Sequence, residues 1–114
     1  MYKTKLNRVQ KVVTKVQYDK LIANGNNPDK DYAPVVKFFN PWGAATWLIS
    51  ELDPNEPNIG FGLCDLGMGS PELGYVDLTE LIGVGRIERD LHFKGNKPMS
   101  EYCEEARSSG SIRA

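Results

Sequence analysis

The only histidine, His92, lies in a segment that also carries two carboxylates at alternating positions. In residues 87–93 (IERDLHF), Glu88, Asp90 and His92 alternate with residues that are apolar except for Arg89. This pattern is typical of a strand with one solvated face, although Arg89 weakens it. Side chains two apart on a strand share a face at about 7 Å. Two carboxylates and an imidazole are ligands for a divalent cation, or an acid–base pair. An ordinary solvated strand face has the same pattern, and we favour that interpretation.

A second acidic set stands at the ends of the segments predicted as central strands. Asp65 and Glu72 flank the turn at 67–71, whereas Glu51 and Asp53 belong to the opposite end of a meander. Two carboxylates meeting across one turn bind a cation or raise one another's pKa. The simpler interpretation is turn capping, in which these oxygens accept loop N–H groups. We therefore expect no metal and no cofactor. Asp65, Glu72, Glu88, Asp90 and His92 are kept as weak metal candidates, and the last three also as weak catalytic candidates.

Aromatic residues bracket the turn at 40–43. Trp42 stands in the turn itself, with Phe39 before it and Trp47 after it. Such a group forms a protein-binding hot spot or a stacking platform for single-stranded nucleic acid. A stacking platform needs interleaved basic residues, and only Lys37 is near. Core packing accounts for most of these rings, so we expect Trp42 to be the exposed one and name Trp42 and Lys37 as partner-binding candidates.

Composition excludes several functional classes. The chain has 114 residues, which predicts one domain, and a net charge of −1, which argues against a strongly basic nucleic-acid-binding protein. No apolar run approaches the roughly 18 residues of a membrane span, and no apolar stretch follows the N-terminal lysines as in a signal peptide. Cys64 and Cys103 lack metal-site spacing and are expected as buried or half-buried thiols in a reducing cytoplasm.

The elements that position these residues follow from turn and capping signals. We predict an α+β domain with an antiparallel meander of about five strands and helices packed on one face. The organisation is a basic arm over 1–13, the domain over 14–110 and a tail over 111–114. The predicted strands are 35–39, 46–52, 59–66, 73–76 and 87–93, and the predicted helices are 15–24 and 101–108.

Three helix starts have recognisable caps. Thr14 with Gln17, and Asp77 with Glu80, have capping-box spacing, and Ser100 precedes an acidic first turn. Gly25 is expected to end the first helix, in a left-handed conformation. Most of the expected core lies on the strands, and it comprises Leu21, Trp47, Ile49, Phe61, Leu63, Tyr75 and Leu91.

Three phrases carry a family resemblance: GAATWLISELDP, FGLCDLGMGSPELGYVDLTEL and IERDLHF. Together they resemble a family of small bacterial proteins known only as a domain of unknown function, common on plasmids, conjugative elements and phages. The resemblance runs from about Thr14 to the C-terminus. It implies a cytoplasmic protein associated with mobile elements and carries over no site residue.

Three functional classes remain. The sequence favours a non-enzymatic protein that binds a protein partner, such as a host defence or regulatory component. A small metal-assisted enzyme would use the Glu88, Asp90 and His92 face. A nucleic-acid accessory protein would use the basic arm together with Arg86, Arg89 and Lys94.

Overall fold

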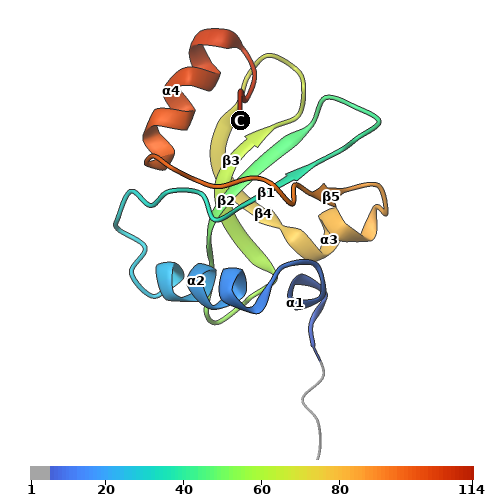
Figure 1. Cartoon of the computed structure of the whole chain (residues 1–114), viewed down its shortest axis with the longest axis vertical. Helices are drawn as coiled ribbons and strands as arrows, with labels where there is room; N and C mark the ends of the chain where they lie inside the picture. Colours follow the sequence, from blue (N-terminus) through green and yellow to red (C-terminus); the bar gives the residue numbers. More distant parts are fainter. Residues whose placement is uncertain (1–5) are drawn as a thin grey trace, which may run out of the picture.

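The computed structural model describes residues 6–114, and this part of the chain forms four helices and one five-stranded sheet (Figure 1). The elements in order are α1 (Arg8–Val12), α2 (Lys15–Gly25), β1 (Val36–Phe39), β2 (Thr46–Leu52), β3 (Ile59–Asp65), β4 (Glu72–Asp77), α3 (Leu78–Gly83), β5 (Glu88–Arg89) and α4 (Met99–Ser109). The predicted α+β class is confirmed. No helix among residues 6–114 combines the length and apolar character needed to cross a membrane.

Strands β1 to β4 pair as an antiparallel meander, as their turn residues predict. The last strand departs from this order, because β5 pairs with β1 and not with β4. The order across the sheet is therefore β4-β3-β2-β1-β5, and α3 lies in the connection that crosses between the two edges. This crossing leaves β4 as one edge of the sheet.

A bulge in β2 decides which side chains face which side. The register against β3 shifts between Ile49 and Glu51, which makes Ser50 the extra residue of a β-bulge. Side chains alternate along a regular strand, but the extra residue interrupts this alternation. Leu52 therefore lies on the same face as Ile49, and both are fully buried. Glu51 is turned to the other face.

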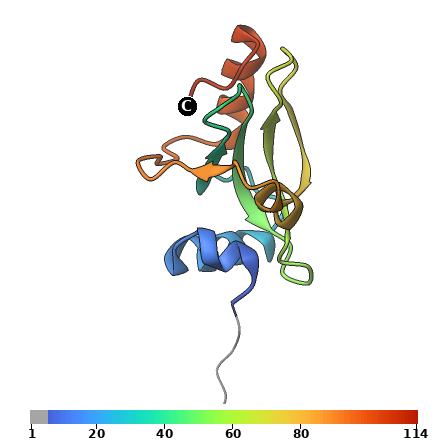
Figure 2. The same cartoon turned by 90° about the vertical axis from the view of Figure 1, so that its right-hand side faces the viewer.

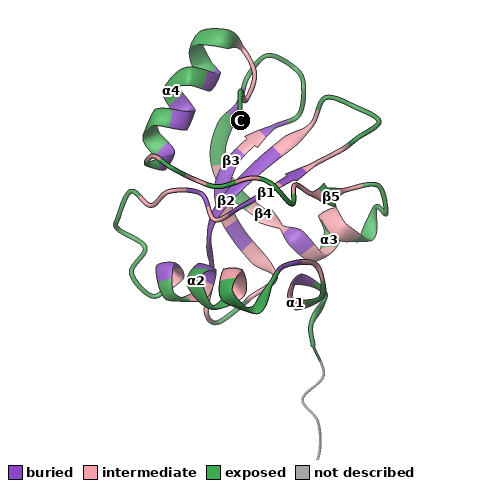
Figure 3. Cartoon of the chain, in the orientation of Figure 1, coloured by how far each residue is buried: buried purple, intermediate pink, exposed green. Residues whose placement is uncertain are grey.

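Two hydrophobic clusters lie on opposite faces of the sheet, so the prediction of helices on one face is wrong. Figure 3 shows buried stretches on the strands and on the helices. The larger cluster packs α1, α2 and α3 against the sheet, and it contains Val9, Val13, Leu21, Val36, Phe38, Trp47, Ile49, Leu52 and Leu78. The smaller one packs Leu48 and Leu63 against α4. Trp47 and Leu48 are consecutive and must point to opposite faces. Figure 2 shows α1 and α2 at one end of the molecule and α4 at the other.

The described part of the predicted basic arm contains helix α1, which packs on the domain. Asn7 caps α1, and its side chain accepts the Gln10 N–H while Gln10 returns a bond to the Asn7 N–H, a complete capping box. Val9 and Val13 are buried in the larger cluster. Residues 1–5, which carry Lys3 and Lys5 of the predicted arm, lie outside the described residues.

Helix α2 begins as predicted and ends for a different reason. The Thr14 and Gln17 capping box is present. Gly25 does not adopt a positive φ; it allows a close approach, since a Cβ there would lie 1.8 Å from the Leu52 carbonyl oxygen. Beside it, the buried Asn24 amide donates to the Ser50 carbonyl oxygen at 2.9 Å. Glycine and asparagine together dock the end of α2 onto the β2 bulge.

The prediction of a strand over 87–93 is wrong beyond its first residues. Only Glu88 and Arg89 pair with β1, after which Asp90 bends the chain. Leu91, predicted as core, is 73% exposed. Tyr75 is also exposed, and Phe61 is half-buried, whereas the other predicted core residues are buried.

The first turn of the C-terminal helix α4 is bonded to a distant loop of the chain. It begins at Met99 after Pro98, not at a Ser100 cap. The Ser100 hydroxyl and N–H instead donate to the Asp31 carboxylate of the 26–33 loop. Gly110 ends the helix with a φ of 80°. The following residues are not a free tail, because the Ile112 N–H donates to Asp65.

Candidate functional site

The structure does not place Glu88, Asp90 and His92 on one strand face, because β5 ends at Arg89. Asp90 Oδ1 accepts the backbone N–H of His92 at 2.8 Å, and Oδ2 pairs with Lys37 Nζ at 3.3 Å. The His92 N–H above all, and Lys37 after it, lower the pKa of Asp90. Within residues 6–114, no group of three His, Cys, Asp or Glu side chains is arranged to hold a metal ion.

Asp65 performs the turn-capping role that was the simpler interpretation. It is 1% exposed; Oδ1 accepts the Gly67 N–H at 2.8 Å, and Oδ2 accepts the Ile112 N–H at 2.9 Å. Glu72 is exposed and stands opposite Cys64 in the strand register. Both Asp65 oxygens therefore serve the fold by joining the β3–β4 turn to the C-terminal segment.

The basic residues proposed for nucleic acid have separate roles. Arg89 Nε donates to the Val12 carbonyl oxygen at 2.8 Å and so ties β5 to α1. Arg86 and Lys94 are exposed. Lys37 is half-buried in its ion pair with Asp90. Arg89 is thus engaged in a structural hydrogen bond, and Lys37, the partner-binding candidate, is engaged in an ion pair.

Three large apolar side chains project from two adjoining turns at one end of the sheet. Trp42, in the β1–β2 turn, is 81% exposed; in the β3–β4 turn, Leu66 is 62% exposed and Met68 is 81% exposed. The turns touch, since a Cβ on Gly67 would lie 2.7 Å from the Ala44 Cβ. We call Trp42, Leu66 and Met68 the turn-end surface. It includes Trp42, the residue expected to be exposed.

A shallow apolar groove of about 300 Å³ continues from Leu66 along the α3 side of the sheet. Its apolar lining comes from β2, the β3–β4 turn, β4, and α3 with the residue after it. It consists of Trp47, Leu66, Val76, Leu81 and Val84. Val84 is 71% exposed. Because Leu66 belongs to both features, the turn-end surface and the groove form one continuous apolar region.

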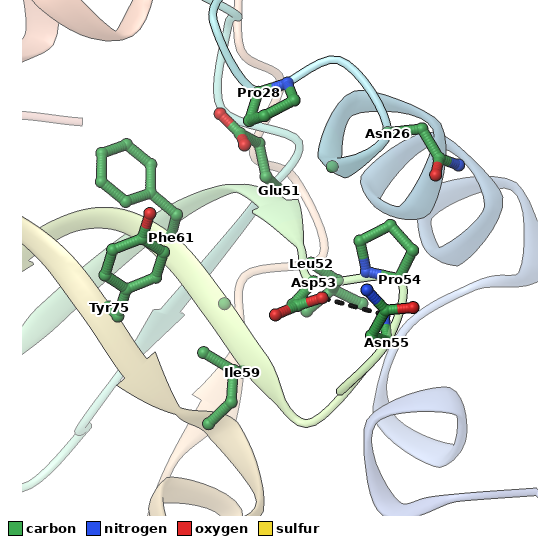
Figure 4. A pocket seen from close by; sticks show the side chains of 12 residues that line it. Asn26, Pro28, Glu51, Leu52, Asp53, Pro54, Asn55, Ile59, Phe61 and Tyr75 are labelled. Atoms are coloured by element: carbon green, nitrogen blue, oxygen red, sulfur yellow. Dashed lines mark hydrogen bonds between the residues drawn. The ribbon is translucent and has the colours of Figure 1, made fainter.

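A cleft of about 340 Å³ lies at the opposite end of the sheet, beside the β2–β3 turn (Figure 4). Its floor is a row of cross-strand neighbours: Glu51 is opposite Phe61, and Phe61 is opposite Tyr75. The two rings lie 5.2 Å apart between centroids with a 60° tilt. The end of α2 and the loop after it complete the wall, with Asn26 and Pro28. We call this feature the Glu51 cleft.

Among residues 6–114, Glu51 is the charged residue that is buried and has no hydrogen-bond or ion-pair partner. Its exposed fraction is 8%, and its carboxylate makes no hydrogen bond or ion pair with any of residues 6–114. No fully enclosed side-chain polar atom in this part of the chain lacks a partner, so the carboxylate contacts solvent through the cleft. Burial first, and then the nearby Asp29 carboxylate, raise the pKa of Glu51.

From the sequence, Glu51 was predicted only as one of several acidic residues at strand ends, and its burial was not predicted. The signal for its burial was the run Ile49-Ser50-Glu51-Leu52, which cannot alternate without a bulge. The exposure of Met68 could have been inferred from its place between two turn glycines. Tyr75 offered no such signal, because its exposure depends on how far α4 extends over the sheet.

The comparisons with known proteins identify a family and no activity. The family model described as "Protein of unknown function (DUF2958)" matches residues 12–113. No curated protein and no solved structure matches the chain. The match covers nearly the whole chain, so this protein belongs to the DUF2958 family, which confirms the resemblance to a domain of unknown function.

Proposed function

We propose that this DUF2958 protein acts without catalysis, by binding a protein partner through its turn-end surface. One observation supports the proposal: Trp42, Leu66 and Met68 are all largely exposed on two turns that touch. Folding gains nothing from exposing such side chains, and a clustered apolar patch on a soluble domain marks an interaction site. The apolar groove that continues from Leu66 enlarges the area available for a partner.

The residue types suit this role. Tryptophan is enriched among the residues that carry binding energy at protein interfaces, and methionine adapts its shape to a partner. Neither Trp42 nor Met68 belongs to the buried clusters, so both are available without unfolding. The partner is expected to offer an apolar pocket that receives the indole ring.

The setting we propose is the cytoplasm of a bacterium that carries a mobile genetic element. The mobile-element association is supported by the family resemblance of the central phrases, and the partner we propose is a host defence or regulatory component. Cys64 and Cys103 are free thiols, half-buried and buried, in keeping with a reducing compartment. Burial raises the pKa of both thiols, which disfavours the reactive thiolate.

Quantitative affinity capture from native host cells tests the proposal. Three baits are compared by mass spectrometry: wild type, the double variant Trp42→Ser with Met68→Ser, and the control Val16→Ser. Val16 is 78% exposed on α2 and does not belong to the turn-end surface. We expect a protein that the wild type and the control capture equally and that the double variant loses. Equal capture by all three baits would contradict the proposal.

A further inference from the structure

We propose that the Glu51 cleft binds the guanidinium group of an arginine side chain from a polypeptide that docks at the β4 edge of the sheet. This site lies at the other end of the sheet from the turn-end surface and does not depend on the function proposed for it. Three features of the cleft support the inference: an unpaired carboxylate on a largely buried residue, an aromatic floor and an open strand edge.

Glu51 is a largely buried residue, and no cation among residues 6–114 pairs with its carboxylate. Carboxylates that are almost fully buried are normally paired or hydrogen-bonded, because removing a charge from water is costly. Glu51 is 8% exposed and has no partner in residues 6–114, yet it lines the cleft. A cation entering the cleft would supply the missing partner.

The charge of the lining selects a cation as the ligand. Glu51 and Asp53 are carboxylates of the lining, and no lysine, arginine or histidine among residues 6–114 lines the cleft. Asp29, on the loop beside Pro28, adds a third negative charge close enough to affect Glu51. Asp53 Oδ1 is already used by the Asn55 N–H, at 2.8 Å, so Glu51 is the principal acceptor.

The aromatic floor of the cleft favours a guanidinium group over an ammonium group as the ligand. Phe61 and Tyr75 stand next to Glu51 in the same cross-strand row, and Tyr75 is 77% exposed. A guanidinium group is planar, stacks on aromatic faces and donates two parallel hydrogen bonds to one carboxylate. An ammonium group is more strongly hydrated and offers a point charge only. The row of ring, ring and carboxylate therefore matches arginine.

The position of the cleft at a sheet edge favours a polypeptide as the source of the arginine. Tyr75 belongs to β4, whose outer side has no neighbouring strand in the described sheet. An edge strand presents unpaired N–H and C=O groups to which an extended peptide can add. A strand paired with β4 would lie three strand spacings, about 14 Å, from β2. The arginine that reaches Glu51 therefore belongs to a part of the polypeptide that lies over Tyr75, not to the paired strand itself.

The test is an NMR titration of the full-length chain with three probes. These are the capped peptide Ac-Val-Thr-Arg-Thr-Val-NH₂, the same peptide with citrulline in place of arginine, and agmatine. Citrulline keeps the shape of arginine without its charge. We expect saturable shifts of the Glu51, Phe61 and Tyr75 amides with the arginine peptide, and at least about tenfold weaker binding of the citrulline peptide.

Two variants and one control complete the test. Glu51→Gln should weaken binding of the arginine peptide at least about tenfold. Tyr75→Ser, at a position that is 77% exposed, should weaken binding as well. Glu56→Gln removes an exposed charge of the adjacent turn that does not line the cleft, and should leave binding unchanged. The Trp42→Ser variant should also bind normally, which separates this site from the turn-end surface.

Three results would overturn the inference. They are equal binding of the arginine and citrulline peptides, unchanged binding by Glu51→Gln, and an absence of saturable shifts with the arginine peptide. Tighter binding of agmatine than of the peptide would overturn the polypeptide as the occupant, since the β4 edge would then contribute nothing.

Discussion

The two ends of the sheet differ in which side chains they expose and which they bury, and each departs from the usual rule of apolar residues inside and charged residues outside. The turn-end surface exposes apolar side chains, with Trp42 and Met68 each 81% exposed, whereas the Glu51 cleft holds a glutamate residue that is 8% exposed. The first arrangement costs the fold little, because exposed apolar side chains are common on protein surfaces. The second costs the fold stability, because a charge is desolvated without a partner. The contrast shows that both ends carry features that folding does not require.

The ends also differ in how rigidly they are built. The cleft end is held by the docking of α2, through the Gly25 approach and the Asn24 bond to Ser50. At the turn end, the Asp65 carboxylate binds the Gly67 and Ile112 N–H groups at the base of the β3–β4 turn, whereas Met68 beyond it is 81% exposed. Substitutions should therefore destabilise the cleft end far more than the turn end, in a graded order.

The largest effect is expected from Gly25→Ala. The new Cβ would lie 1.8 Å from the Leu52 carbonyl oxygen, so α2 or β2 must move. We expect a loss of about 3 kcal/mol, the upper range for overpacking, measured by chemical denaturation. The turn-end counterpart is Gly69→Ala, which has open space but a φ of +84° and should cost about 1–2 kcal/mol. Equal losses would mean that the cleft end is not the more rigid one.

Asn24→Ala should follow, with a loss of about 1–3 kcal/mol. It leaves the Ser50 carbonyl oxygen of the bulge without the 2.9 Å bond from the Asn24 amide. The midpoint of urea denaturation measures the loss. A variant as stable as wild type would show that the bulge does not rely on α2.

Thr14→Ala should cost about 1 kcal/mol, because it removes the side-chain acceptor for the Gln17 N–H at the start of α2. Asn7→Ala offers a matched comparison at the cap of α1. Chemical denaturation of both variants, with an unchanged m-value, would check the estimate. An unchanged midpoint for Thr14→Ala would place the start of α2 elsewhere.

Glu51→Gln should instead stabilise the protein at neutral pH. Because burial raises the pKa of Glu51 above its ordinary value of 4.5, the folded state holds the proton more tightly than the unfolded state. The ionised group therefore lowers stability above the raised pKa, and this penalty disappears as the pH falls below 4.5. The advantage of the variant should shrink over the same window. Stability curves against pH for wild type, Glu51→Gln and Glu56→Gln measure it, and a constant difference would contradict the assignment.

The smallest effects belong to the turn-end surface. Trp42→Ser and Met68→Ser should each change stability by less than about 0.5 kcal/mol, as expected of exposed positions. Thermal melting checks this expectation. A large loss from either variant would mean that the side chain supports the fold, and would remove the basis for the proposed interaction.

Much of the fold could be predicted because local signals agree with tertiary structure. The Pro and Gly turns place β1 to β4, and Thr14 and Asp77 cap helices as expected. The alternation in IERDLHF predicted a strand, but the Asp90 side chain binds the His92 N–H and bends the chain there. Asn7 and Gln10 had the same capping-box spacing as Thr14 and Gln17, so α1 could have been found by the same rule.

The candidate sites were harder to predict than the fold. Trp42 could be selected because it stands between turn residues. The cleft could not, because it depends on the β2 bulge and on the place where α2 docks. Alternation assigned Tyr75 to the core, and the limited reach of α4 leaves it exposed. A local pattern indicates which side of a strand a residue faces, but not what covers that side.

The central claim, that the turn-end surface binds a protein, is tested most directly by calorimetric titration of the captured partner into wild type, Trp42→Ser and Val16→Ser. We predict that Trp42→Ser weakens the affinity by roughly thirtyfold, the loss of about 2 kcal/mol that defines an interface hot spot, while Val16→Ser keeps the wild-type Kd. Binding of Trp42→Ser with the wild-type Kd would contradict the claim.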